Sequence, residues 1–364
     1  MQSIQVGLEG RGYQVHVGHG ILDRLGPQCR DLDLGRQVAV VTDQTVAPHY
    51  LERVQASLQA AGYRTFPAVI SGGDPAKNLQ TAEQVFARLI EAGMDRQDWV
   101  LALGGGVVGD LAGFVAATFL RGIAWVQVPT TVVAQVDASI GGKTAVNHAL
   151  GKNLIGAFHQ PRLVCIDTEV LRTLPRPERV AGLAEVVKHA LIRDEELFAF
   201  LEARLEEVVE LQLEPDLLDW LIGRNVEIKA RVVEADEREG GLRAILNYGH
   251  TIGHALEAAT GYTRYRHGEG VILGMIGAGQ IARQRGLWSA EEQRRQDALL
   301  ERLGVPGGAQ EVPAEQILER ARADKKRAAG RFHFVLLRRV GQAEVVEVEE
   351  AQVRAAIEYV RQRC

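Results

Sequence analysis

Cysteine is scarce in this sequence. Its 364 residues include three cysteines, Cys29, Cys165 and Cys364, and none of them forms a CxxC spacing. We therefore expect neither a disulfide framework nor a thiolate zinc site, and a reduced cytoplasmic setting is the simplest interpretation. Residues 1–15 lack a cationic region followed by an apolar one, so no signal peptide is expected. No apolar run reaches the roughly 18 residues that a membrane span needs.

An excess of basic residues is also absent. The formal net charge is −5, with 24% charged and 46% hydrophobic residues. This composition is typical of an ordinary globular protein, and it argues against broad contact with nucleic acid, which usually needs a basic face. A small anionic substrate is still compatible with it, because a pocket can be basic on an acidic protein. The length is sufficient for two domains.

Strand-like and helix-like segments alternate in the first half of the chain. The β-branched segment 37–42 and the apolar segment 99–103 are typical of buried strands. Helical patterns follow them, at 50–61 and 111–119. Alternation of this kind predicts a parallel sheet with helices on both faces.

Long helical patterns dominate beyond Pro175. The heptad-like spacing of apolar residues in 197–211 strongly indicates a helix. We take the change in composition near Pro175 as the domain boundary. The sequence thus predicts an α/β domain over residues 1–175 and a mostly α-helical domain over residues 176–364.

A glycine-rich turn separates an expected strand from an expected helix. Gly104, Gly106 and Gly109 satisfy a loose GxGxxG pattern, which lets a backbone approach a pyrophosphate at a helix N-terminus. The usual acidic residue about 20 positions further on is replaced by Pro-Thr-Thr at 129–131, and at least two strand–helix units precede the turn. A tight turn without a ligand is the alternative. Asp43, which ends an earlier expected strand, is a candidate for binding a ribose.

The segment 141–144 (GGKT) resembles part of a P-loop. That motif requires a glycine where Asp137 stands, and the order of strand and loop is also wrong, so we exclude a nucleoside triphosphatase. Lys143 is still expected to reach an anion, because glycines on one side expose it. Lys152 and Asn153 lie in a glycine-flanked loop and offer donors to a phosphate or carboxylate. A solvated surface loop is the alternative.

Three histidines and one carboxylate are candidates for a metal site. His250 and His254 are four residues apart, and His267 follows. Glu185 and Lys188 share one face of a mostly apolar helix, where an unpaired charge is expensive. Histidines close in sequence with one acidic partner elsewhere suit a catalytic zinc with three protein ligands and an open position. Structural histidines and an intrahelical ion pair are the alternatives.

Six stretches in consistent order carry a resemblance to a known family. They are GGGVVGDLAGFVAATFLRG, VPTTVVAQVDASIGGKTAVN, GKNLIGAFHQP, LPRPERVAGLAEVVKHALI, DEREGGLRAILNYGHTIGHALE and HGEGVILGM. With them the chain resembles the 3-dehydroquinate synthases over nearly its whole length. Glycerol dehydrogenase-like and iron-dependent alcohol dehydrogenases are more distant relatives with the same architecture.

The resemblance implies a Rossmann-like NAD-binding domain followed by a helical domain that binds metal and substrate. It implies conversion of 3-deoxy-D-arabino-heptulosonate 7-phosphate into 3-dehydroquinate and phosphate, a step of the shikimate pathway. The steps would be transient oxidation by NAD, β-elimination of phosphate, re-reduction and aldol closure. NAD and one divalent metal, Zn²⁺ or Co²⁺, are the implied cofactors. A cytoplasmic homodimer without nucleic-acid or membrane partners is also implied.

The resemblance further implies roles for individual residues. The metal ligands would be Glu185, His250 and His267. The catalytic groups would be Lys143, Lys188, Glu239, Asn247 and His254, with Glu239 and His254 transferring protons. The substrate would be held by Arg121, reaching across a dimer interface, and by Asp137, Lys152, Asn153, Lys229, Arg243 and Lys325. NAD would contact Asp43, Gly72, Asp74, Lys77, Gly106, Val107, Val108, Gly109, Asp110, Thr130, Thr131, Lys143, Lys152 and Thr173.

One position departs from the family pattern, and three rival functions follow from other interpretations. Gly270 stands where the family commonly has alanine, and we expect it to loosen the start of its helix slightly. The rivals are a sibling sugar phosphate cyclase that makes an inosose or a valiolone, a metal-dependent alcohol dehydrogenase, and a catalytically silent binding protein. The siblings usually change the residues corresponding to Asn247, His254 or the Lys325 region, which this sequence keeps.

Overall fold

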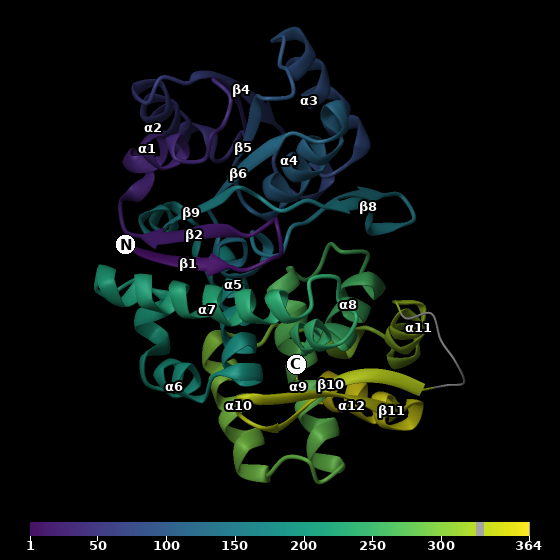
Figure 1. Cartoon of the computed structure of the whole chain (residues 1–364). Helices are drawn as coiled ribbons and strands as arrows, with labels where there is room; N and C mark the ends of the chain where they lie inside the picture. Colours follow the sequence, from purple (N-terminus) through teal and green to yellow (C-terminus); the bar gives the residue numbers. More distant parts are fainter. Residues whose placement is uncertain (325–330, 364) are drawn as a thin grey trace. The chain divides into compact units, whose positions relative to one another are not determined.

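The computed structural model describes residues 1–324 and 331–363. The chain divides into two compact units, one formed by Met1–Leu174 with Leu213–Glu234 and the other by Pro175–Gln212 with Ala235–Cys364 (Figure 1). Within the described ranges, no helix combines the length and apolar character of a membrane span. Lys325, predicted to bind substrate, lies outside the described residues.

The first unit contains a seven-stranded sheet in the order β1-β2-β9-β6-β5-β3-β4. All neighbours in it are parallel except the antiparallel pair β1–β2. The strands of this sheet are β1 (Gln2–Val6), β2 (Tyr13–Gly18), β3 (Gln37–Asp43), β4 (Arg64–Ile70), β5 (Trp99–Gly104), β6 (Ala124–Pro129) and β9 (Leu163–Asp167). A separate antiparallel hairpin is formed by β7 (Lys143–His148) and β8 (Gly151–Phe158).

Helices cover both faces of this sheet, as the alternation of segments predicts (Figure 1). The helices of the first unit are α1 (Leu25–Arg30), α2 (Ala47–Ala60), α3 (Leu79–Glu91), α4 (Gly106–Thr118) and α7 (Pro215–Ala235). Its short helical turns are η1 (Ile21–Arg24), η2 (Asp74–Ala76), η3 (Phe119–Arg121), η4 (Ala134–Ala138) and η5 (Thr168–Thr173). Ala39 and Val100 belong to a core with residues of α3 and α4, whereas Val38, Val40 and Leu101 belong to a second core with residues of α1 and α2. Successive strand residues therefore enter opposite cores.

Helix α7 returns to the first unit after two helices of the second. The predicted single division at residue 175 assigns this helix to the second domain, and so does not describe the return. Asp219 of α7 is buried and accepts hydrogen bonds from the Thr168 hydroxyl (2.6 Å) and the backbone N–H of His19 (3.1 Å). These contacts join residues far apart in sequence, so local sequence patterns do not predict them.

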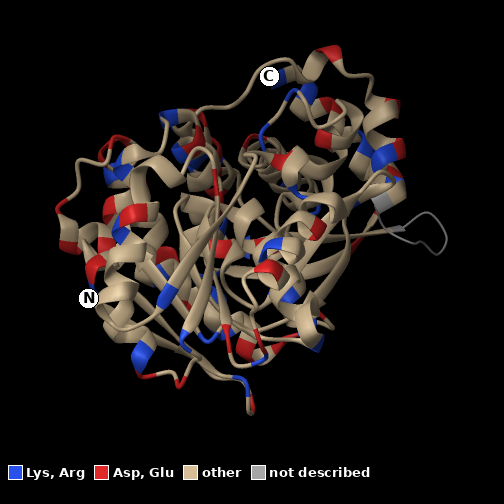
Figure 2. Cartoon of the chain, turned by 90° about the horizontal axis from the view of Figure 1, so that it is seen from above, with Lys and Arg blue, Asp and Glu red and all other residues tan. Residues whose placement is uncertain are grey.

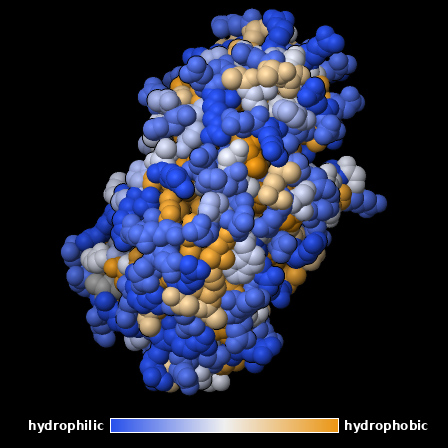
Figure 3. Space-filling view, turned by 90° about the vertical axis from the view of Figure 1, so that its left-hand side faces the viewer, coloured by the Kyte–Doolittle hydropathy of each residue, from blue (hydrophilic) through white to orange (hydrophobic). Residues whose placement is uncertain are grey.

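The second unit is mostly helical, as predicted. Its helices are α5 (Arg176–Arg193), α6 (Glu195–Val209), α8 (His250–Ala259), α9 (His267–Gln284), α10 (Ala290–Leu303), α11 (Ala314–Asp324) and α12 (Glu350–Arg363). It also contains the turns η6 (Leu242–Asn247) and η7 (Ala309–Glu311) and the antiparallel hairpin of β10 (Arg331–Arg339) and β11 (Gln342–Glu349). Acidic and basic residues are interspersed over the ribbons in Figure 2, in agreement with the small net charge. The face in Figure 3 is mostly hydrophilic.

Glycines bring helices α8 and α9 into backbone contact. A Cβ on Gly274 would lie 1.7 Å from the carbonyl oxygen of Gly249, and a Cβ on Gly253 would lie 2.6 Å from the carbonyl oxygen of Gly270. The four glycines occupy positions i and i+4 along their segments, so they line one seam. No larger residue fits there without moving a backbone.

A further glycine brings α9 against α5. A Cβ on Gly268 would lie 1.8 Å from the carbonyl oxygen of Ala181 in α5. His267 precedes this contact, and Glu185 lies one helical turn beyond Ala181. The contact therefore holds a histidine and a carboxylate on two different helices within reach of each other.

We predict that Gly274→Ala destabilises the protein despite the better helix propensity of alanine. The propensity gain is about 1 kcal/mol, whereas a methyl group against the rigid Gly249 carbonyl costs about 1–3 kcal/mol or more. Urea unfolding followed by circular dichroism measures the loss. Gly307→Ala is the matched control, because a Cβ there meets nothing within 4 Å. Equal unfolding midpoints for the two variants would show that the seam is not tight.

Candidate active site

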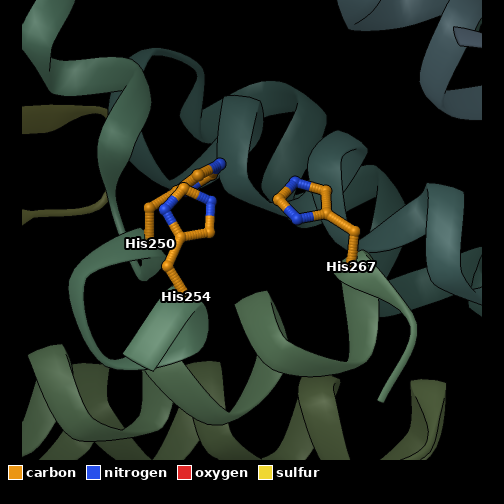
Figure 4. A group of neighbouring side chains, drawn as sticks. All are labelled: His250, His254 and His267. Atoms are coloured by element: carbon orange, nitrogen blue, oxygen red, sulfur yellow. The ribbon is translucent and has the colours of Figure 1, made fainter. Parts of the chain in front are cut away.

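Three imidazoles converge at the ends of α8 and α9 (Figure 4). His250 begins α8, His254 lies one turn further along it, and His267 begins α9. Each histidine offers one ring nitrogen to a group whose members lie within 4.8 Å of one another, and the ring centroids are 5.0 to 5.6 Å apart. His250 is buried and the other two are half-buried. Neutral imidazoles at these separations suit a divalent transition metal.

Glu185 supplies a buried carboxylate to the same cluster. Its Oε1 lies 3.1 Å from His267 Nε2 and 3.7 Å from His250 Nε2, and its Oε2 lies 2.5 Å from the ammonium of Lys188. Glu185 and Lys188 are almost fully buried in α5. A buried charge needs a partner or a metal, and this carboxylate faces two imidazoles that could share a cation with it. The predicted ligands Glu185, His250 and His267 are thus close together, although the distances alone also admit His254.

Hydrogen bonds on the far side of two rings fix their orientation. His250 Nδ1 donates to the carbonyl oxygen of Tyr248 (3.1 Å), and His267 Nδ1 donates to Oε1 of Glu257 (3.1 Å). In both rings Nε2 then faces Glu185, which is the nitrogen a metal would use. The sequence analysis did not identify Tyr248 or Glu257. The available signal for Glu257 was its position on the same helix as His250, two turns away.

His250 and His267 differ in their protonation. Burial lowers the pKa of His250 to about 3, so its ring is neutral at any physiological pH. Burial also works against the charged form of His267, but the hydrogen bonds that its ring donates to Glu185 and Glu257 outweigh it and raise the pKa of that ring above its usual value. Binding of a cation at His267 Nε2 therefore has to displace a proton.

The charged segment before α8 is an ordered turn built on Asp236. The Asp236 carboxylate accepts backbone N–H groups of Gly240, Gly241 and Arg243 at 2.7 to 2.9 Å. These bonds lower the pKa of Asp236, and the bond from the backbone N–H of Arg243 has the largest effect. The sequence analysis missed Asp236, for which the following Gly-Gly pair was the only signal. The turn places Glu239 in a left-handed conformation with φ of 63°.

One predicted substrate group, Arg243, and two predicted catalytic groups, Glu239 and Asn247, lie on this turn or directly after it. Arg243 is 2% exposed, and its guanidinium donates to the carbonyl oxygen of Glu237 at 2.5 Å. Asn247 donates from its amide to Oε1 of Glu239 at 3.1 Å. The second unit therefore brings Asn247 and Glu239 together and holds Arg243 in a fixed, buried position.

The predicted NAD residues gather at the carboxyl ends of neighbouring parallel strands in the first unit. Asp43 ends β3, Gly72 follows β4, Gly106 follows β5 and Thr130 follows β6. Thr173 follows β9 at the end of η5. This edge of a parallel sheet is where dinucleotides bind in α/β folds. The sequence separates these residues widely, and the strand order makes them neighbours.

The glycine-rich turn is the N-terminus of helix α4. Gly106, Val107, Val108, Gly109 and Asp110 form its first turn. A Cβ on Gly104 would lie 2.6 Å from Val108, so the helix packs tightly on the strand that precedes it. Thr131 lies against Gly105, where a Cβ would be 3.0 Å from its methyl carbon. The free N–H groups of such a helix start attract anions.

Basic residues of the first unit are held by carboxylates. Lys77 forms an ion pair with Asp110 and donates to Oδ1 of Asn153 at 2.5 Å. Burial raises the pKa of Asp110, and the charge of Lys77 opposes that rise. Lys229 of α7 pairs with Asp137. The unit thus joins predicted cofactor and substrate residues through direct contacts.

The hairpin of β7 and β8 carries three further predicted residues. Lys143 begins β7 and is exposed, and Lys152 and Asn153 are the second and third residues of β8. The Lys152 ammonium lies 3.3 Å from Oδ2 of Asp74, a predicted NAD residue. Arg121 lies elsewhere, exposed in η3 with φ of 73°.

The chain was compared with known proteins. Residues 67–181 match the family model for the N-terminal part of 3-dehydroquinate synthase, and residues 182–327 match that for its C-terminal part. The 3-dehydroquinate synthase of Nostoc punctiforme is 48% identical over 347 residues, covering 94% of this chain and 95% of the relative.

Two solved structures of sugar phosphate cyclases are also similar. A 2-deoxy-scyllo-inosose synthase complexed with carbaglucose-6-phosphate, NAD⁺ and Co²⁺ has a TM-score of 0.89 at 27% identity, covering 98% of this chain and all of that one. The 2-epi-5-epi-valiolone synthase of Streptomyces hygroscopicus, with NAD⁺ and Zn²⁺ bound, has a TM-score of 0.88 at 29% identity, covering 97% of each chain.

Substitution of single histidines separates a ligand from a proton-transfer group. We predict that His250→Ala loses tightly bound zinc, because its Nε2 faces Glu185 and its ring is held in place. We predict that His254→Ala keeps about one zinc per chain but turns over slowly. Elemental analysis after dialysis against a weak chelator measures both. Loss of zinc from His254→Ala as complete as from His250→Ala would make His254 a ligand.

Proposed function

The chain belongs to the 3-dehydroquinate synthase family, and we propose that it converts 3-deoxy-D-arabino-heptulosonate 7-phosphate into 3-dehydroquinate and phosphate. It is then a phosphate-eliminating carbon–oxygen lyase of the shikimate pathway. The observation that carries this conclusion is the identity to a relative named for the activity over nearly the whole of both chains, well above the identity to the sibling cyclases.

NAD and one divalent metal are the cofactors, as in the two similar cyclases. When bound, they supply a hydride acceptor that returns its hydride and a Lewis acid that polarises the reacting oxygen. Among the described residues, the cluster around Glu185 fits the metal, since it combines a buried carboxylate with converging imidazole nitrogens. We assign Glu185, His250 and His267 as ligands, which leaves a position open for the substrate.

We assign proton transfer to His254 and Glu239. His254 belongs to the imidazole cluster and is half-buried, so it borders the proposed metal position without being needed as a ligand. Glu239 is held by the amide of Asn247, which orients its carboxylate. A carboxylate and an imidazole differ in basicity, so the two groups can serve different proton transfers.

The remaining cations neutralise a substrate that carries both a phosphate and a carboxylate. In the second unit these are Arg243 and Lys188, both almost fully buried. In the first unit they are Lys143, Lys152 and Lys229, and Asn153 and Asp137 add polar contacts. Charge-assisted hydrogen bonds are roughly twice as strong as neutral ones, and a fixed cation stabilises developing negative charge without reorganisation.

We assign NAD to the carboxyl edge of the parallel sheet. The pyrophosphate would bind the N-terminus of α4, where Gly106 and Gly109 let it approach the backbone. Asp43 would bind the ribose, since it ends the strand next to β5. The other contacts of this site are Gly72, Asp74, Lys77, Val107, Val108, Asp110, Thr130, Thr131 and Thr173.

A homodimer in the cytoplasm completes the proposal. Arg121 is exposed and follows Leu120, which is also exposed, in a stretch where both residues have positive φ. Both residues are accessible in their unit, as contact with a second copy requires. Cys29 and Cys165 are free and buried, in agreement with a reducing compartment.

Product identification tests the function. We predict that incubation with the heptulosonate phosphate, NAD and Zn²⁺ releases phosphate and 3-dehydroquinate in equal amounts, without net NADH, because each hydride is returned. Coupled phosphate detection, mass spectrometry and NADH absorbance measure the three quantities. Glucose 6-phosphate is the control substrate and should remain unchanged. Its conversion would favour a sibling cyclase, and accumulating NADH would favour a dehydrogenase.

Subunit mixing tests the role of Arg121. We predict that Arg121→Ala and His250→Ala are each inactive alone. If Arg121 acts on the partner's site, a heterodimer has one site with both native residues, so a mixture allowed to exchange subunits recovers about a quarter of wild-type activity. Steady-state turnover before and after exchange measures this. No recovery from subunits shown to have exchanged would place Arg121 outside the partner's site.

A further inference from the structure

A second buried carboxylate lies behind the proposed metal ligand His267. Glu257 of α8 is 4% exposed, and its Oε1 accepts a hydrogen bond from His267 Nδ1 at 3.1 Å. On the basis of the proposed metal centre, we propose that Glu257 is a positioning residue that orients His267 toward the cation and polarises it.

The placement of the His267 ring supports this proposal. Glu257 contacts one ring nitrogen and Glu185 the other, at equal distances of 3.1 Å. The ring is therefore held from two sides, by carboxylates from two different helices. Across the described part of the chain, His267 is the side chain that the Glu257 carboxylate binds. Such a buried carboxylate is expensive without a partner, so its position is tied to the ring.

The contrast with His250 indicates what Glu257 adds. His250 Nδ1 donates to a neutral backbone carbonyl, whereas His267 Nδ1 donates to a carboxylate. A carboxylate draws the Nδ1 proton more strongly and makes Nε2 a better electron-pair donor to a metal. It also brings a second negative charge close to a dication, in addition to that of Glu185. We therefore expect His267 to be the stronger of the two imidazole ligands.

Gly270 leaves the space that the Glu257 carboxylate occupies. A Cβ at position 270 would lie 2.8 Å from Oε1 of Glu257, the atom that binds His267, and 3.2 Å from the carbonyl oxygen of Gly253. The backbone of Gly253 cannot move away, because α8 and α9 are in contact along the seam. A methyl group would therefore shift the end of the flexible Glu257 side chain. The sequence analysis expected Gly270 only to loosen the helix start, and the structure gives it this more specific position.

A purely structural account makes different predictions. If Glu257 only joins α8 to α9 as a buried ion pair, its loss lowers the stability of the fold and leaves the affinity for metal unchanged. If it positions His267, its loss weakens metal binding and changes the ligand field, whatever the change in stability. Metal affinity and the spectrum of a bound Co²⁺ ion therefore decide between the two accounts.

The test compares Glu257→Gln with wild type in the full-length chain. Glu257→Gln keeps the shape of the side chain and removes its charge. We expect Zn²⁺, measured by chelator competition, to bind about 10–100-fold more weakly to this variant, and the visible bands of bound Co²⁺ to shift. Thermal unfolding without added metal records the stability of each variant.

One matched control completes the design. Glu206→Gln removes the charge of a surface ion pair with Arg302 in the same unit. It should bind metal as wild type does. Wild-type Zn²⁺ affinity and an unshifted Co²⁺ spectrum in Glu257→Gln would overturn the role of Glu257. Absence of metal binding by wild type would instead contradict the metal centre of the proposed function.

Discussion

Contact between the backbones of three helices is the constraint on which the metal-type cluster depends. Gly268 sets α9 against α5, and Gly274 sets α9 against the segment that leads into α8. At these distances a single methyl group on either glycine would separate the helices by more than the tolerance of a coordination bond, which is about 0.2 Å. His250 and His267 each begin a helix at this junction, so their positions follow from the packing and not from flexible loops.

In the first unit, buried lysines are paired with carboxylates. Its buried cations have carboxylate partners, as in the pairs Lys77–Asp110 and Lys229–Asp137. In the proposed site an anionic ligand would meet cations whose positions are already fixed, so its contacts would replace existing ion pairs instead of ordering mobile side chains. This arrangement is compatible with a net charge of −5, because carboxylates balance the cations that the proposal assigns to the substrate and the cofactor.

Local sequence patterns were sufficient for the fold of each unit and insufficient for contacts between distant segments. Continuous apolar runs in β3 and β5, which alternate with helical segments, predicted the parallel sheet, since each strand buries both faces. The return of α7 could not be predicted, because Asp219 meets Thr168 and the chain near His19 only after folding. The ligand and substrate roles of individual residues came from the family resemblance, and they stay predictions. Glu257 was missed because its partner is set by the approach of α9.

The course of the chain through α7 also bears on how the protein is made. The polypeptide enters the second unit at residue 175, leaves it at 213 and enters it again at 235. During synthesis the sheet of the first unit emerges from the ribosome long before the helix that carries Asp219, the partner of Thr168. Domains usually fold in order as they emerge, but here the first unit lacks α7 until residues 213–234 have been translated. A nascent chain can therefore complete its first unit only after two helices of the second have been made.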